Sequence, residues 1–370
     1  MSLTTGIGLI MIALGALGQA ALPADKRDTA VTRDTTKFDQ IYLLGLQGSM
    51  AEGLKFLDSL DPESVTERQQ EERQRYFARF RAADESYVHR TSDTSVVRII
   101  DMYHSYWRRA LLDHKSLARF DTLLADSISN YLLAHDSELR GRAGQEIRDD
   151  FPRHLQEYLR RRGVYSATGK TGLFFDLLLH TEETESNYRV TTPEDTIRVR
   201  VVFMENMISN GWEEYATFGK YFPGGWATGE ALYCAKETYD TTSENFTVSY
   251  LKHEGKHFAD YKKFPKLTGA DLEYRAKLVE LSAAQESLYE LIGIFIRNSA
   301  TDRQNPHAFA NHCVIRDLSQ ACGLKGDNTS IASWEAVPAT TLNAQAERLL
   351  KKNSLELSIA GADKVESFIR

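Results

Sequence analysis

The sequence contains 370 residues, of which 42% are hydrophobic, and its formal net charge is -7 with an isoelectric point near 5.9. This length accommodates one large domain or two of ordinary size, and the hydrophobic fraction is typical of a protein with a buried core, which excludes fibrous and wholly disordered classes. The acidic balance provides no basic surface to neutralise phosphates, so we expect no nucleic-acid partner.

The first 20 residues have the pattern of a secretory signal peptide. Residues 6–17 form an apolar run that is too short to span a bilayer, and small residues follow it, so cleavage is expected after Ala20. The positively charged start of such signals is absent, because no Lys or Arg precedes Gly6. We expect an exported protein, periplasmic or secreted, with a membrane anchor formed by this segment as the alternative. Residues 21–37 are polar and are predicted to be a linker.

Residues 38–162 have a helical pattern almost throughout. Apolar residues recur at helical spacing in 96–112 and 117–133, and 63–82 consists largely of Glu, Arg and Gln. Charged runs of this kind usually form solvated helix faces, and no fixed-period repeat indicates a solenoid. We predict an all-α region here, which could bind a protein partner.

The pattern changes near residue 163, where strand signals begin. Apolar residues alternate with Arg198 and Arg200 between 188 and 203, the period-2 pattern of a strand with one solvated face. A second strand is predicted over 226–235, and helical periodicity returns beyond it. The predicted fold class is therefore α+β, and mostly helical.

Three cysteines occur in the chain, Cys234, Cys313 and Cys322. In an oxidising compartment Cys313 and Cys322 could form a disulfide and leave Cys234 free; the alternative is three small buried residues. None has C-x-x-C spacing, which excludes a cysteine zinc cluster.

The segment His253-Glu254-Gly255-Lys256-His257 matches the H-E-x-x-H pattern of zinc enzymes. Residues four apart lie on one face of a helix, so both imidazoles could bind a tetrahedral Zn²⁺. The glutamate of such a motif is not a ligand; it takes a proton from the water on the metal and passes it to the leaving amine. The alternative is a solvated helix with two incidental histidines, which the charge of Lys256 within the motif favours. Gly255 also weakens a helix interior, by about 1 kcal/mol relative to Ala.

A third protein ligand is expected on the next helix. Thr268 and Asp271 match a capping box, and the pattern predicts one long helix from Asp271 to about Arg297. Glu273 and Glu280 are seven residues apart on that helix and share a face. Either carboxylate could complete a site of two histidines and one glutamate, with the fourth position open to water as catalytic zinc requires.

Together these segments resemble the gluzincins, zinc peptidases that pair H-E-x-x-H with a glutamate on the next helix. In that family a small residue commonly follows the ligand glutamate by three positions, and Ala276 follows Glu273 in this way, so the resemblance favours Glu273 over Glu280. The resemblance covers about residues 226–281. It implies an exported bacterial protein with a zincin-like region over 163–370, in which a small sheet accompanies the two ligand helices.

The resemblance also implies residues for the remaining roles. His307 is the candidate oxyanion donor, the alternative being a loop histidine outside the site. Asp260 and Asp271 could each orient a ligand imidazole, or lie on the surface. The strand 226–235 could bind an extended peptide along its edge, or be an ordinary strand of the sheet.

These expectations describe a zinc metallopeptidase, a hydrolase that binds Zn²⁺ through His253, His257 and Glu273 and acts on a peptide or protein substrate. Glu254 would activate the water. One alternative is an inactive zinc-binding protein whose N-terminal helices bind a partner, although such a protein has no chemical need of Glu254. The other is a helical protein without a metal.

Overall fold

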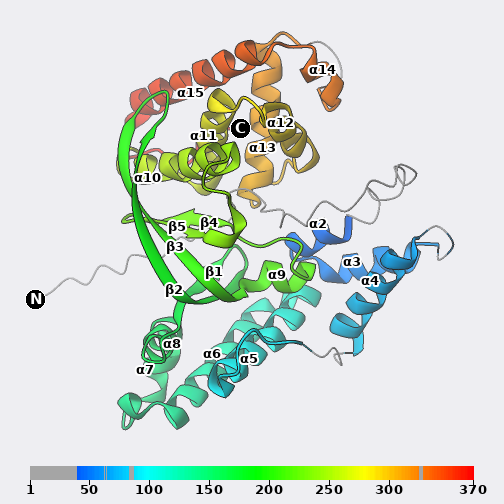
Figure 1. Cartoon of the computed structure of the whole chain (residues 1–370), viewed down its shortest axis with the longest axis vertical. Helices are drawn as coiled ribbons and strands as arrows, with labels where there is room; N and C mark the ends of the chain where they lie inside the picture. Colours follow the sequence, from blue (N-terminus) through cyan, green and yellow to red (C-terminus); the bar gives the residue numbers. More distant parts are fainter. Residues whose placement is uncertain (1–39, 62, 64, 83–86, 325–327) are drawn as a thin grey trace, which may run out of the picture. The chain divides into compact units, whose positions relative to one another are not determined.

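The computed structural model describes residues 40–370 except 62, 64, 83–86 and 325–327 (Figure 1). The predicted signal peptide and linker lie outside the described residues. The described chain forms two compact units: unit 1 contains residues 40–183 and 204–223, and unit 2 contains residues 184–203 and 224–370. The chain is of the α+β class and mostly helical, as the sequence predicts.

Unit 1 is built mainly from helices packed around one apolar core. Asp93 caps α5 (Thr94–Leu112), because its Oδ1 accepts hydrogen bonds from the backbone nitrogens of Ser95 and Val96. The helices predicted over 96–112 and 117–133 are confirmed as α5 and α6. The helical elements of unit 1 are α2 (Gln40–Leu46), α3 (Met50–Ser59), α4 (Glu67–Phe77), the π-helix η2 (Ala78–Ala82), α5 (Thr94–Leu112), η3 (His114–Ser116), α6 (Leu117–His135), η4 (Ser137–Leu139), α7 (Gly144–Asp149), α8 (Phe151–Arg160) and α9 (Gly211–Thr217).

One sheet has the strand order β1-β2-β3-β5-β4. Its strands are β1 (Tyr165–Thr171), β2 (Phe174–Thr191), β3 (Thr196–Asn210), β4 (Gly225–Ala227) and β5 (Leu232–Ala235). β1 and β2 pair antiparallel, with Tyr165 opposite His180 and Thr171 opposite Phe174. The boundary predicted between 162 and 163 falls just before this sheet begins, whereas the compact units divide within β2 and β3.

The two predicted strands have different outcomes. In β3, Val199 and Val201 are buried whereas Arg198 and Arg200 are exposed, so the predicted alternation is confirmed. The single strand predicted over 226–235 is wrong: the segment folds into antiparallel β4 and β5. A turn separates them, in which the Thr228 nitrogen donates to the Ala231 carbonyl.

Helix α11 is central in unit 2, where it packs against α10, α13 and α15 (Figure 1). The single helix predicted from Asp271 to about Arg297 is wrong, because the chain becomes extended at Ala284. Glu244 stabilises the break by accepting hydrogen bonds from the backbone of Gln285 and Ser287. The helical elements of unit 2 are η5 (Lys236–Thr238), the π-helix η6 (Asn245–Lys252), α10 (His253–Lys263), α11 (Gly269–Ala283), α12 (Leu288–Arg297), α13 (Pro306–Ala321), α14 (Ile331–Glu335) and α15 (Ala339–Gly361).

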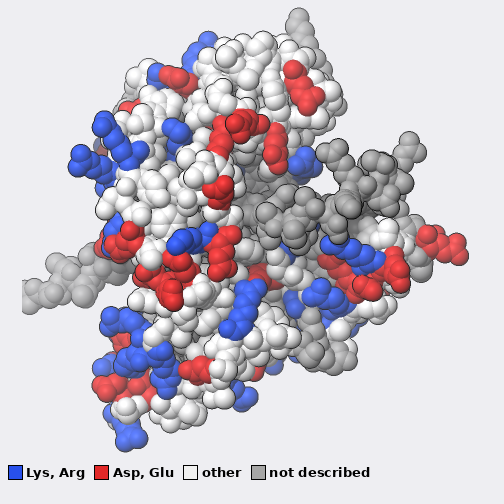
Figure 2. All heavy atoms as spheres, viewed as in Figure 1, with Lys and Arg blue, Asp and Glu red and all other residues white. Residues whose placement is uncertain are grey.

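The charged run predicted over 63–82 forms α4 and η2, in which Glu67, Glu71 and Arg75 are exposed but Arg79 is buried. Where α7 and α8 lie, Figure 2 shows acidic and basic side chains interspersed. Arg153, for example, contacts both Asp150 and Glu157 on the surface of α8. Exposed pairs of this kind stabilise a fold by only about 0–1 kcal/mol each. Among the described helices, none combines the length and hydrophobicity that crossing a membrane requires.

The disulfide that the sequence leaves open between Cys313 and Cys322 is not formed, and Cys234 is also a free thiol. Cys313 lies within α13, and Cys322 lies at its C-terminal cap. Nine residues of helix rise about 13 Å, about twice the separation of Cα atoms that a disulfide can bridge. A disulfide between Cys313 and Cys322 therefore cannot form while α13 is intact.

Candidate metal centre

Helix α10 carries the H-E-x-x-H segment and follows directly from the π-helix η6. The hydroxyl of Ser243 accepts a hydrogen bond from the Phe246 nitrogen at 3.2 Å, which supports the start of η6. Short π-helical segments are frequent beside functional sites. The helical spacing predicted for His253 and His257 is confirmed, since their rings lie on one face with centroids 4.8 Å apart.

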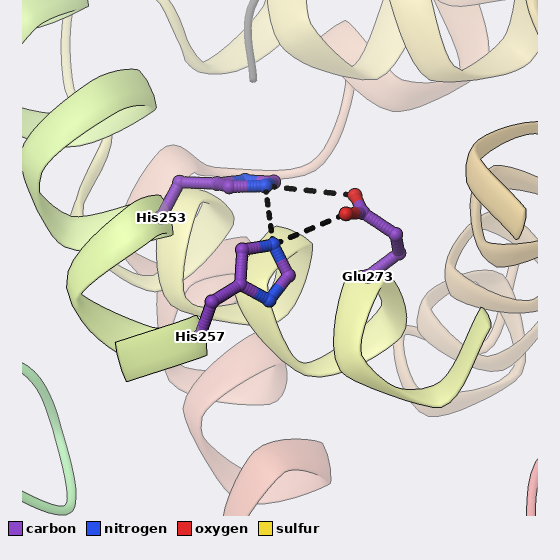
Figure 3. Close-up of side chains that lie close together, drawn as sticks. All are labelled: His253, His257 and Glu273. Atoms are coloured by element: carbon purple, nitrogen blue, oxygen red, sulfur yellow. Dashed lines mark hydrogen bonds and ion pairs between the residues drawn. The ribbon is translucent and has the colours of Figure 1, made fainter. Parts of the chain in front are cut away.

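Glu273 reaches the two histidines from α11 (Figure 3). Its carboxylate oxygens lie 3.5 Å from Nε2 of His253 and 3.1 Å from Nε2 of His257, and the two Nε2 atoms are 3.1 Å apart. Ligand atoms about 2.0–2.1 Å from a tetrahedral zinc are separated by about 3.3 Å. The spacing of these nitrogen and oxygen atoms therefore matches three corners of such a tetrahedron.

Glu280 occupies a different position from Glu273. Its carboxylate forms a short hydrogen bond with Nδ1 of His253, on the opposite side of the ring from Nε2. Burial would lower the pKa of His253, but the charges of Glu280 and Glu273 outweigh this effect and raise it to about 10. A carboxylate on Nδ1 orients an imidazole so that Nε2 can bind a metal. The geometry thus places Glu273 among the ligand atoms and Glu280 behind them.

Glu254 is almost completely buried beside the histidines, and neither of its carboxylate oxygens has a hydrogen-bond partner within the described chain. Burial raises the pKa of this carboxyl to about 7, although the nearby charges of His257 and His253 act to lower it. A buried carboxylate without a hydrogen-bond partner destabilises the folded state unless another polar group donates a hydrogen bond to it. A water molecule held next to this carboxylate would do so.

His307 lies at the start of α13, where Asn305 caps the helix through a hydrogen bond from the Ala308 nitrogen. Its Nδ1 is 2.8 Å from a carboxylate oxygen of Glu273. Burial lowers the pKa of His307, and the charge of Glu273 opposes this effect. The alternative of a loop histidine outside the site is therefore wrong, because His307 is helical and contacts a candidate ligand. Its contact with Glu273 leaves the oxyanion role a prediction.

The two aspartates predicted to orient an imidazole, or to lie on the surface, do neither. Asp260 is fully buried and binds the guanidinium of Arg275. Asp271 is also buried and accepts hydrogen bonds from the backbone nitrogens of Phe368 and Ile369. The imidazole-orienting carboxylate comes instead from Glu280.

Three tyrosines near the site were not singled out from the sequence. The hydroxyls of Tyr239 and Tyr261 are buried without a hydrogen-bond partner among the described residues, and the buried hydroxyl of Tyr250 lies beside the Cys234 thiol. The Tyr261 ring stacks on His257 with centroids 6.3 Å apart. Tyr261 follows His257 by four residues, so helical spacing alone could have identified it as a neighbour.

The buried group of His253, His257 and Glu273 could bind a metal ion, since its ligand atoms all lie within 4.8 Å of one another. Two imidazoles and one carboxylate leave room for a fourth ligand at a tetrahedral ion. The unpaired oxygens of Glu254 are consistent with a polar molecule at that position. No protein-family model matches the chain, and comparison with curated proteins and with solved structures gives no significant match.

Proposed function

We propose that this chain is a zinc-dependent hydrolase of peptide bonds, in which His253, His257 and Glu273 hold the metal and Glu254 is the general base. The observation that carries the proposal is the meeting of these four side chains from two helices. Three supply ligand atoms at tetrahedral spacing, and the fourth is a buried carboxylate with both oxygens unpaired. The gluzincin resemblance of the same residues supports this assignment.

The side chains suit zinc in both their chemistry and their charge. Imidazole nitrogen and carboxylate oxygen are common zinc ligands, and two histidines with one glutamate are a known catalytic set. Burial would raise the pKa of Glu273, but the charges of His307, His257 and His253 hold it well below its usual range, so the carboxylate is ionised as a metal ligand must be. When bound, zinc would polarise the scissile carbonyl and lower the pKa of its bound water.

Glu254 would carry the proton in this reaction. It would accept the proton of the attacking water and then deliver it to the leaving amine. A pKa near 7 allows one carboxyl to act first as a base and then as an acid at neutral pH. Because its oxygens have no protein hydrogen-bond partner among the described residues, no competing contact would have to break.

The substrate would be a peptide or protein bound in extended form. β4 is an edge strand of the sheet, and α10 packs against it. A peptide that adds to such an edge forms main-chain hydrogen bonds without requiring a particular sequence. The N-terminal sequence pattern further supports the proposal that the protein acts after export.

The test compares wild type with Glu254→Gln and His253→Ala, using zinc content and cleavage of a broad peptide library. We expect one zinc per chain in wild type and in Glu254→Gln, and loss of zinc in His253→Ala. Cleavage should fall by about 10²–10⁴-fold in Glu254→Gln, the usual contribution of a general base.

Two outcomes would contradict the proposal in different ways. Wild type without zinc would reject the metal centre itself. Equal behaviour of wild type and Glu254→Gln towards the library, with zinc retained in both, would reject the peptidase and leave the inactive zinc-binding protein as the better description.

A further inference from the structure

Directly beside the candidate ligands, four buried charged residues form a closed ring of ion pairs. Nζ of Lys256 is 2.7 Å from the Glu194 carboxylate and 3.1 Å from that of Asp260. Arg275 closes the ring, with Nε 2.7 Å from Asp260 and Nη2 3.1 Å from Glu194. We call these four residues the ionic ring. Positive and negative charges alternate around it.

The ionic ring is shielded from water. The side chains of Lys256, Asp260 and Arg275 are 0% exposed, and that of Glu194 is 8% exposed. Burying an ion is costly, and only good geometry and further hydrogen bonds offset that cost. The charges of Lys256 and Arg275 hold the pKa of Glu194 below its usual value although burial acts to raise it. Each residue of the ring forms ion pairs with two residues of opposite charge.

The ionic ring connects the two helices that carry the candidate ligands. Lys256 lies between Glu254 and His257 on α10, and Arg275 lies two residues after Glu273 on α11. Asp260, which is also on α10, joins the two helices through its ion pair with Arg275.

Two further contacts attach the ionic ring to the rest of unit 2. Glu194 belongs to the turn between β2 and β3, in which the Thr192 nitrogen donates to the Asp195 carbonyl. Nη1 of Arg275 donates to the Asn353 side chain of α15 at 2.7 Å. The ring therefore fixes α10 and α11 to a strand turn and to a third helix.

We propose that the ionic ring is a positioning device for the metal centre, holding α10 and α11 at the separation and rotation that bring His253, His257 and Glu273 together. The proposal rests on the proposed metal-binding function. A functional site requires its side chains within about 0.5 Å of the productive geometry. As a source of stability alone an apolar cluster would serve as well, whereas in some proteins buried ionic groups set which elements pack together and in what register.

The ionic ring also accounts for Lys256, whose charge at that position of the motif favours a solvated helix when the sequence is considered alone. In the structure its side chain is wholly buried among three carboxylates, with Asp195 at 3.5 Å as the third. Lys256 is therefore a positioning residue that acts through the helix it shares with His257.

The experiment separates positioning from stability with two variants. Lys256→Met removes one cation and leaves a surplus of buried negative charge. Lys256→Met combined with Glu194→Gln restores the charge balance of the ring but removes the contact between α10 and the turn that carries Glu194. Zinc affinity is measured by competition with a chromophoric chelator, coordination geometry by the visible spectrum of the Co²⁺ form, and stability by thermal unfolding.

We expect both variants to bind zinc about 10- to 100-fold more weakly than wild type, the usual effect of residues that support metal ligands. Their Co²⁺ spectra should differ from that of wild type. The thermal midpoint should fall in Lys256→Met and recover in the double variant, so that weak zinc binding persists in a stable protein. The double variant keeps the test decisive if Lys256→Met fails to fold.

Two control variants match these changes. Lys262→Met alters an exposed lysine of the same helix, and Ile292→Ala destabilises the core through α12, which carries no candidate ligand. Both should retain wild-type zinc affinity. Wild-type affinity in the double variant, or an equal loss of affinity in Ile292→Ala, would overturn the positioning role. Wild type that binds no zinc would reject the metal centre, and the ring's role with it.

Discussion

Units 1 and 2 both bury carboxyl groups completely, but Asp176 and Glu213 in unit 1 differ in ionisation from Glu273 in unit 2. In unit 1, burial raises the pKa of Asp176 to about 6, and burial together with the charge of Asp176 raises that of Glu213 to about 8. In unit 2, burial acts on Glu273 in the same direction, yet neighbouring imidazoles hold its pKa well below the usual range. The charges around a buried carboxyl therefore decide its ionisation.

The contacts of these groups explain the difference. Asp176 accepts hydrogen bonds from the backbone nitrogens of Leu177 and Trp212 and so fixes the start of α9. No ion pair joins Asp176 or Glu213 to a base in the described part of the chain. Glu273, by contrast, lies among three histidines. Among the described residues, the group that could bind a metal ion therefore contains a buried, ionised carboxylate of unit 2, whereas Asp176 of unit 1 holds backbone nitrogens.

Removing the metal should have the largest effect, and it should separate the two units. A ligand that binds only the folded state, at about a thousand times its dissociation constant, stabilises that state by about 4 kcal/mol. A zinc chelator should therefore accelerate amide hydrogen exchange in α10 and α11 but leave α5 and α6 unchanged. Equal changes in both units, or no change in either, would contradict the assignment of the metal to unit 2.

Glu213→Gln should have the next largest effect, and it tests the neutral acid of unit 1. The folded state raises the pKa of Glu213 from 4.5 to about 8, so it binds more protons than the unfolded state between these values. Its contribution is present below pH 4.5 and is lost as the pH rises to 8. At about 1.4 kcal/mol per pKa unit the full loss is about 5 kcal/mol, of which about 4 kcal/mol falls between pH 5 and pH 9.

The measurement is urea unfolding of wild type and Glu213→Gln at pH 5 and pH 9. An amide cannot ionise, so the variant should lose much less stability between the two pH values. Glu182→Gln, which alters an exposed glutamate of β2, should retain the wild-type dependence. If the free energy of unfolding of all three proteins depended on pH in the same way, the prediction that folded Glu213 is neutral at pH 5 would be wrong.

Much of unit 2 could be predicted from local pattern, because helical spacing determines which side chains share a face. The pairing of His253 with His257 and the choice of Glu273 over Glu280 agree with the observed geometry. The break after α11 could not be predicted in this way, because it depends on Glu244, which lies far away in the sequence. Asp260 likewise looked like a surface or imidazole-binding residue until its partner on another helix was known.

Two residues of the motif, Gly255 and Lys256, are unfavourable for a metal-binding helix when the sequence is considered alone, and tertiary contacts explain both. Lys256 belongs to the ionic ring. Gly255 faces the strands, where a Cβ atom would lie 3.1 Å from Val190 and 3.4 Å from Ile197. Neither contact is visible in a helical pattern, because each joins segments about 60 residues apart in the sequence.

Gly255→Ala should have the smallest effect, and it tests how closely α10 packs against the strands of the sheet. Alanine favours a helix interior by about 1 kcal/mol over glycine, but crowding a packed core costs about 1–3 kcal/mol. We therefore expect a net loss of up to about 2 kcal/mol in urea unfolding. Gly293→Ala in α12 is the matched control, because its Cβ atom would meet only the end of the Arg297 side chain at 3.2 Å and Ile331 at 3.8 Å. That variant should gain up to about 1 kcal/mol from helix propensity alone. Equal gains in both variants would mean that Val190 and Ile197 shift at little cost, and that the packing of α10 against the strands does not require glycine at position 255.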